Sequence, residues 1–164
     1  MEFEEYVAAR GRALERYAFV LTGDPQRAQD LVQTALVKAY RHWGRVGRTE
    51  HPDAYVRRIV TTSYLDWRRR RGSHEEPLAE PPETHPPVPD PADRVAAHDE
   101  LRRALATLTS QQRAVLVLRH YEGYDDASIA GVLGCSEGTV RSHASRGAQR
   151  LRAVLVPTRL PEES

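Results

Sequence analysis

Arginine and small hydroxyl side chains are concentrated near the C-terminal end of the chain. Those predicted to project from the outer side of one helix are Thr139, Arg141, Ser142, Ser145 and Arg146. No acidic residue occurs from Gly138 through Pro161. Short hydroxyls can reach phosphates, and arginine can donate two parallel hydrogen bonds to a guanine edge, so this composition suits the DNA major groove. The alternative is a solvated basic face on an ordinary helical hairpin.

The surrounding stretch, residues 125–152, has the pattern of two helices joined by a tight turn. The first helix carries Ile129, Ala130, Val132 and Leu133 at helical spacing, and Gly134 follows where the chain must leave it. Ser136 is a good N-cap for the second helix, and Val140 is predicted to face inward. These offsets are typical of a helix-turn-helix. Gly147 has no explanation in the sequence, because glycine weakens a helix by up to about 1 kcal/mol relative to alanine.

A second group of arginines is interleaved with aromatic rings in residues 52–71. Pro52 predicts the start of a helix whose buried stripe is Val56, Ile59, Val60, Ser63 and Trp67. The residues predicted to lie outside are Tyr55, Arg57, Arg58, Thr61, Thr62 and Tyr64, followed by Arg68–Arg71. Unstacked bases stack on rings while cations neutralise phosphate, so this face suits single-stranded nucleic acid. The segment alone supports equally well half-buried aromatic packing beside a solvated charge run.

Two amphipathic helices precede this segment. The first covers residues 3–21, and Gly23, Asp24 and Pro25 predict its end and the N-cap and first residue of the next helix. The second helix is predicted to run to about His42. Its inward stripe is Ala28, Leu31, Val32, Ala35, Leu36, Ala39 and Trp43, which leaves Gln29, Asp30, Gln33, Thr34 and Arg41 for solvent or a partner.

A proline-rich, acidic segment divides the chain into two predicted domains. Residues 72–92 contain no Lys or Arg and cannot build a core, so they are expected to form a flexible linker. The expected organisation is therefore all-α: a helical domain in residues 1–71, the linker, a second helical domain in residues 93–156, and a disordered tail in residues 157–164. A helix from about Asp93 and another capped by Thr109 or Ser110 precede the helix-turn-helix.

Composition argues against several other classes of protein. No run of apolar residues is long enough to cross a membrane and no secretory signal is evident, so the protein is expected to be cytoplasmic. The single cysteine, Cys135, rules out an internal disulfide. The 7 histidines show no metal-ligand spacing, and no phosphate-binding glycine loop occurs. We therefore expect no metal, no cofactor, no catalytic residues and no enzymatic activity.

Three segments resemble parts of bacterial sigma factors. LTSQQRAVLVLRHYEGYDDASIAGVLGCSEGTVRSHASRGAQRLR, from Leu108 to Arg152, resembles sigma region 4. AQDLVQTALVKAYRHW (Ala28 to Trp43) and HPDAYVRRIVTTSYLDWRRRR (His51 to Arg71) resemble sigma region 2. With only these two regions and a short linker, the chain resembles the extracytoplasmic-function (ECF) group, in particular its actinobacterial, SigE-like branch. Thr62 stands where relatives of that group commonly have asparagine.

The resemblance implies a promoter-specificity subunit of RNA polymerase. Asp30, Leu31 and Gln33 would bind the clamp helices of the largest core subunit, and the flap of the second-largest subunit would be a further contact. The candidates for melting the minus 10 element and capturing a flipped base are Arg57, Arg58, Thr61, Thr62, Tyr64 and Trp67. Those for reading the minus 35 duplex are Thr139, Arg141, Ser142, Ser145 and Arg146. The resemblance also allows an anti-sigma factor as a partner.

Two other functions are compatible with the residues alone. A stand-alone helix-turn-helix regulator would use its N-terminal helices for sensing or dimerisation and would favour a palindromic site. A pure interaction module would use the outward arginines to bind a protein partner.

Overall fold

The computed structural model describes residues 1–71 and 92–155, and every regular element within these two ranges is helical. The all-α prediction is therefore confirmed. Contacts divide the chain into two units, Met1–Arg71 and Gly72–Ser164. The expected tail and all of the expected linker except Ala92 lie outside the described residues. Among the described helices, none combines the length and apolar character that crossing a membrane requires.

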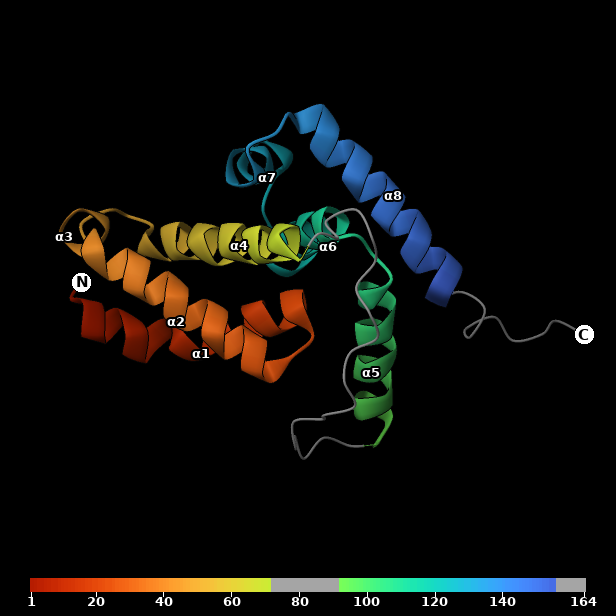
Figure 1. Cartoon of the computed structure of the whole chain (residues 1–164), viewed down its shortest axis with the longest axis horizontal. Coiled ribbons are helices and arrows are strands. Elements are labelled where there is room, and N and C mark those ends of the chain that lie inside the picture. Colours follow the sequence, from red (N-terminus) through yellow and green to blue (C-terminus); the bar gives the residue numbers. More distant parts are fainter. Residues whose placement is uncertain (72–91, 156–164) are drawn as a thin grey trace, which may run out of the picture. The chain divides into compact units, whose positions relative to one another are not determined.

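The first unit contains α1 (Phe3–Thr22), α2 (Pro25–Arg41), the short α3 (Trp43–Val46) and α4 (Pro52–Arg70). Helices α1 and α2 pack side by side, and α4 packs on both of them (Figure 1). The core between them is formed by fully buried apolar side chains, including Leu14, Tyr17, Leu21, Ala35, Val56 and Val60. Burial of this shared core supplies the main force that holds the three long helices together.

The turn between α1 and α2 has the conformation that the sequence predicts. Gly23 has a positive φ of 71°, and its N–H donates to the Phe19 carbonyl at 2.8 Å. The Asp24 carboxylate then accepts a hydrogen bond from the Gln26 N–H at 2.9 Å, and Pro25 occupies the first position of α2. A left-handed glycine and an aspartate cap thus reverse the chain within a few residues.

Asp53, in the first turn of α4, is the centre of a polar link between α4 and α1. Its carboxylate accepts hydrogen bonds from the Tyr6 hydroxyl at 2.9 Å, from Arg10 Nη2 at 3.1 Å and from Arg57 Nε at 2.6 Å. Burial alone would raise the pKa of Asp53, but the hydrogen bonds from Arg10 and Arg57 outweigh burial, and the pKa is lowered. Burial also raises the pKa of the Tyr6 phenol, and the neighbouring carboxylate raises it further. We call Tyr6, Arg10, Asp53 and Arg57 the Asp53 cluster.

The second unit contains α5 (Ala92–Ala106), α6 (Ser110–Leu116), a π-helical turn η1 (Val117–Tyr121), α7 (Asp126–Leu133) and α8 (Glu137–Leu155). Helix α8 packs against α5, α6 and α7. The buried apolar side chains of this unit include Leu108, Val115, Leu118, Ile129 and Val140. Thr109 is the cap of α6, because its hydroxyl accepts from the Gln112 N–H at 3.2 Å and the Gln112 side chain accepts from the Thr109 N–H at 3.2 Å.

Gly147 lies where α8 passes closest to α6. A Cβ atom at this position would be 2.8 Å from Leu116 Cδ1 and 3.4 Å from Gln112 Cβ. A separation of 2.8 Å is well inside the ordinary contact distance between carbon atoms. Close packing between two helices therefore explains the glycine that the sequence left unexplained.

Candidate nucleic-acid interface

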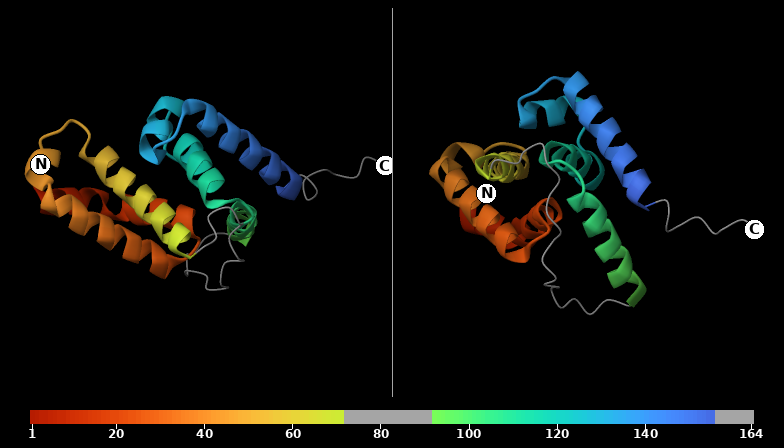
Figure 2. Two further views of the ribbon diagram at one scale, coloured as in Figure 1. Left: turned by 45° about the horizontal axis from the view of Figure 1, so that its top comes forward. Right: turned by 45° about the vertical axis from the view of Figure 1, so that its right-hand side comes forward.

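Helices α7 and α8 form the predicted helix-turn-helix, joined by a short turn (Figures 1 and 2). Gly134 ends α7 with a φ of 68°, and its N–H donates to the Ala130 carbonyl at 2.9 Å. Ser136 Oγ accepts the Thr139 N–H at 3.1 Å, as expected of an N-cap, and its hydroxyl also lies 3.0 Å from the Thr139 hydroxyl. Val140 is fully buried below the turn. The predicted turn chemistry is confirmed at each of these positions.

The outer face of α8 is polar, basic and exposed. The arginine and hydroxyl side chains predicted to face outward are all exposed: Thr139, Arg141, Ser142, Ser145 and Arg146. Arg150 and Arg152 extend the same exposed basic surface, and none of the four arginines from 141 to 152 forms an ion pair within the described residues. Unpaired guanidinium groups on one helix favour a polyanion as the partner.

His143 lies at the edge of this face and is half-buried. Partial burial lowers the pKa of His143, and the positive charge of Arg146 lowers it further. The imidazole therefore favours its neutral form near neutral pH, and the positive charge of α8 comes from its arginines.

The face of α4 differs from the prediction. Arg58 is exposed, Thr62 and Trp67 are half-buried, and the Thr62 hydroxyl donates to the Arg58 carbonyl at 2.9 Å. The prediction that Arg57 and Thr61 face outward is wrong. Arg57 is 6% exposed and belongs to the Asp53 cluster, with its guanidinium 5.4 Å from the centre of the Tyr17 ring.

Thr61 and Tyr64 are buried with 0% of their surface exposed, and Arg68 is 6% exposed, so the prediction of an outward position is also wrong for Tyr64 and Arg68. The Thr61 hydroxyl donates to the Arg57 carbonyl at 2.8 Å and shares a short hydrogen bond with the Tyr17 hydroxyl of α1. Since Thr61 uses its own proton on the carbonyl, Tyr17 is the donor in the second bond. The buried face of α4 is therefore wider than the apolar stripe indicated, because Arg57 and Thr61 find polar partners inside the unit.

The predicted polymerase-contact residues on α2 are also divided by the structure. Asp30 and Gln33 are exposed, as expected. Leu31 is only 7% exposed and belongs to the core, as its place in the inward stripe predicts, so it is not part of the exposed surface that carries Asp30 and Gln33. The exposed side chains around Asp30 and Gln33 include Thr34, Val37, Lys38 and Arg41, which line a shallow polar depression.

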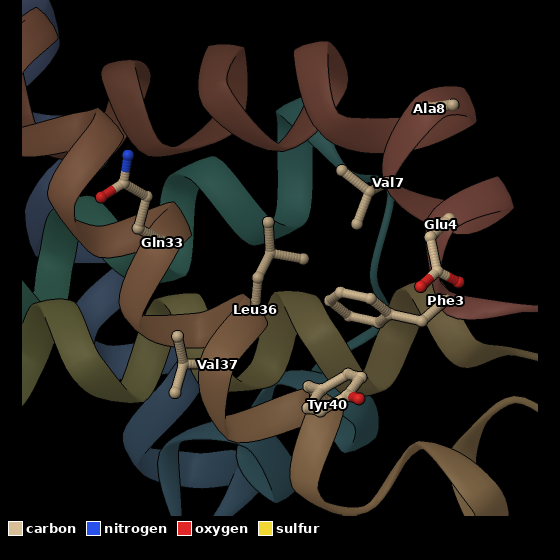
Figure 3. A pocket seen from close by; sticks show the side chains of 8 residues that line it. All are labelled: Phe3, Glu4, Val7, Ala8, Gln33, Leu36, Val37 and Tyr40. Carbon is tan, nitrogen blue, oxygen red and sulfur yellow. The ribbon is translucent and has the colours of Figure 1, made fainter.

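An apolar groove between α1 and α2 continues this surface (Figure 3). It is lined by Phe3, Glu4, Val7, Ala8, Gln33, Leu36, Val37 and Tyr40. Val37 is 57% exposed and Tyr40 is 62% exposed, and the Tyr40 ring is held edge-to-face against Phe3 with ring centroids 5.1 Å apart. An exposed apolar surface of this kind is typical of a protein-binding site. The sequence held a signal for it, since Val37 and Tyr40 lie outside the predicted inward stripe.

The described residues offer no binding site for a metal ion. Within residues 1–71 and 92–155, no group of three or more His, Cys, Asp or Glu side chains is placed to hold a metal ion. The candidates for function described above are the three exposed surfaces on α8, α4 and the α1–α2 pair.

Comparison with known proteins identifies two regions in the order that the sequence predicts. Residues 6–74 match Sigma-70 region 2, and residues 98–151 match Sigma-70 region 4. The chain belongs to the sigma-70 family, in its ECF group. Such a sigma factor directs core RNA polymerase to specific promoters and initiates transcription from a DNA template. This confirms the resemblance seen in the sequence.

Named relatives span almost all of this sigma factor. RNA polymerase sigma-E factor of Streptomyces coelicolor is 41% identical over 156 residues, covering 95% of this chain and 87% of the relative. ECF RNA polymerase sigma factor SigL of Mycobacterium tuberculosis is 34% identical over 157 residues, covering 93% and 86%. Among solved structures, the sigma factor RpoE of Bartonella quintana, in complex with the anti-sigma factor NepR, has a TM-score of 0.72 at 25% identity and covers 96% of this chain and 98% of that one.

Proposed function

We propose that this ECF sigma factor divides promoter recognition and polymerase binding among its three exposed surfaces, in the cytoplasm where RNA polymerase works. Helix α8 reads the minus 35 duplex, the outer face of α4 binds the opened minus 10 strand, and the α1–α2 surface binds core polymerase. The observation that carries this proposal most directly is the exposed, unpaired basic face of α8. The surfaces on α4 and on the α1–α2 pair extend it to the first unit.

The composition of α8 supports duplex recognition. Ser142 and Ser145 are small enough to approach phosphates, while Arg141 and Arg146 can donate two hydrogen bonds to a guanine in the major groove. The rigid packing of α8 through Val140, Ala144 and Gly147 fixes which side chains point outward. A helix fixed in this way can read base edges, because its side chains approach the groove in one register.

Fewer residues of α4 are accessible for binding the minus 10 strand than the sequence predicts. Opening a duplex costs about 1.4 kcal/mol of stacking per step, and without ATP hydrolysis that cost is offset by binding the opened strand better than the closed one. Arg58 and Thr62 are accessible on α4 and are the proposed contacts. Arg57, Thr61 and Tyr64 are proposed to support them indirectly, because their burial keeps α4 in place.

The α1–α2 surface has the properties of a site for a partner helix. An apolar groove takes the apolar side of an amphipathic helix, and nearby polar residues fix its register. Val37 and Tyr40 supply the apolar part, while Asp30 and Gln33 supply polar contacts. The proposed occupant is the pair of clamp helices of the largest core subunit; the flap of the second-largest subunit would contact the second unit. A relative solved with an anti-sigma factor makes a protein of that class a second proposed partner.

Run-off transcription tests the proposal. Core RNA polymerase from an actinobacterium is incubated with pooled genomic promoter fragments, with and without this protein. We expect new, discrete start sites that share sequence at two spaced upstream elements. Absence of new transcripts, together with tight binding of the protein alone to a palindromic duplex, would refute the proposal and favour a stand-alone regulator.

A further inference from the structure

Three guanidinium groups gather around the indole ring of Trp67, near the C-terminal end of α4. The guanidinium carbon of Arg27, from the first turn of α2, lies 4.2 Å from the ring centroid. The corresponding distances are 5.3 Å for Arg71 and 5.9 Å for Arg68. Arg27 is far from these residues in the sequence, so the helices α2 and α4 assemble the group. We call Arg27, Trp67 and Arg71 the Trp67 cluster.

The positive charge of the Trp67 cluster is not neutralised by Asp24 or Asp66. Asp24 caps α2 by accepting backbone N–H groups, and Asp66 pairs with Arg69 at 3.3 Å. Neither Arg27 nor Arg71 forms an ion pair within residues 1–71 and 92–155. Two accessible cations held beside one ring without a carboxylate attract an anion.

The position of Arg27 also changes the expected role of Trp67. A guanidinium 4.2 Å from the ring centroid occupies the space that a nucleobase would need to stack on that face of the ring. The ring instead holds the planar guanidinium in one orientation, so that its remaining N–H donors are preorganised for a ligand. A planar, bidentate donor of this type is well matched to a phosphate group.

We propose that Arg27 and Arg71 together bind a backbone phosphate of promoter DNA, and that Trp67 is a positioning residue that orients Arg27. The proposal rests on the function proposed above and adds to it a contact from α2 outside the predicted DNA-binding residues. A phosphate contact supplies affinity and register without sequence preference.

The test is the salt dependence of promoter-fragment binding by the reconstituted holoenzyme. Arg27→Gln removes the charge, Trp67→Leu removes the ring, and Arg12→Gln is the matched control because Arg12 is an exposed arginine of α1 without an ion pair in the described part of the chain. We expect Arg27→Gln to weaken binding equally on different promoter sequences. The plot of log affinity against log salt concentration has a negative slope, and Arg27→Gln should make that slope shallower by about one, as for one lost phosphate contact.

The double variant distinguishes positioning from base stacking. If Trp67 acts through Arg27, Arg27→Gln with Trp67→Leu should lose little more affinity than either single change. The proposal is overturned if Arg27→Gln has the same slope and affinity as Arg12→Gln, or if the losses from the two single variants add fully. Thermal melting of each variant separates a folding defect from lost binding.

Failure of the wild-type holoenzyme to bind any promoter fragment would refute the proposed function instead. In that case the full-length chain is titrated alone with fluorescein-labelled oligo(dT), over the same salt series. The phosphate site would still be supported if Arg27→Gln made the salt slope for oligo(dT) binding shallower and Arg12→Gln did not. An unchanged slope, or no binding by the wild-type chain, would overturn it.

Discussion

Replacement of Gly147 by alanine brings two opposing effects into direct competition. Alanine is favoured over glycine in a helix by about 1 kcal/mol. Against this gain, the new methyl group would lie 2.8 Å from Leu116 Cδ1, and Leu116 is itself buried in the second unit. Overpacking a well-filled core typically costs about 1–3 kcal/mol. We therefore expect Gly147→Ala to destabilise the second unit by about 1 kcal/mol, which corresponds to roughly 4–8 °C in Tm for a domain of this size.

Gly131→Ala is the matched control for this substitution. Gly131 lies within α7, and a Cβ atom there would have no other heavy atom within 4 Å. The same chemical change should therefore stabilise the second unit, by up to about 1 kcal/mol. Both substitutions bring the same gain in helix propensity, but only Gly147 has close neighbours. The difference between the two changes in unfolding free energy therefore gives the packing cost.

Both tryptophans, Trp43 and Trp67, belong to the first unit, so the two units can be followed separately. Tryptophan fluorescence should follow unfolding of the first unit, whereas far-ultraviolet circular dichroism follows both units. Gly147→Ala should lower the Tm of the second unit, which circular dichroism detects and fluorescence does not, and should leave the Tm of the first unit unchanged. If Gly147→Ala instead raised the Tm of the second unit as much as Gly131→Ala does, the close approach of α6 and α8 would not be the reason for the glycine.

Three further predictions concern the other surfaces and the Asp53 cluster. Asp53→Asn should destabilise the first unit by about 2–3 kcal/mol, because buried Arg57 loses its counter-charge. Since the folded-state pKa of Asp53 is lowered, its contribution to the stability of the first unit is present above the ordinary aspartate pKa of about 4 and is lost as pH falls below it. Fluorescence-detected denaturation should show this acid sensitivity in the wild type and not in the variant. Arg146→Ala should cost about 1–3 kcal/mol in promoter binding and relax preference at one position, so an unchanged profile on a promoter library would contradict base reading by Arg146. Tyr40→Ala should weaken core-polymerase binding about tenfold or more in a competition assay, whereas Arg16→Ala, at an exposed site two turns beyond the groove, should not; equal affinities would exclude the groove as the contact.

Helix ends and turns were predictable from sequence because their chemistry is local. Gly23, Asp24, Gly134 and Ser136 each perform the capping role that their type and position indicate. The outward face of α8 was also predictable, since its buried positions are apolar or small and its exposed ones are polar. Where the pattern along the chain separates these two classes cleanly, the helix has only one way to face its core.

The inward face of α4 was not predictable from apolar spacing, because polar residues occupy part of it. Arg57 can be buried because Asp53, one turn earlier, and Tyr17, from α1, provide partners. The Asp53 to Arg57 spacing of four residues was visible in the sequence as a local pair, but the contributions of Tyr6, Arg10 and Tyr17 depend on tertiary packing. Gly147 was unexplained for the same reason, since Leu116 and Gln112 belong to a different helix.

The Asp53 cluster has a consequence for how such a domain can change over evolutionary time. A guanidinium as buried as that of Arg57 needs a carboxylate beside it, so loss of Asp53 alone should be selected against more strongly than simultaneous loss of both charges, which removes only the acceptor of Tyr6 and Arg10. Positions 53 and 57 should therefore vary together among homologues. Position 10 should be freer, because the Arg10 side chain is 43% exposed and can return to water when its partner disappears.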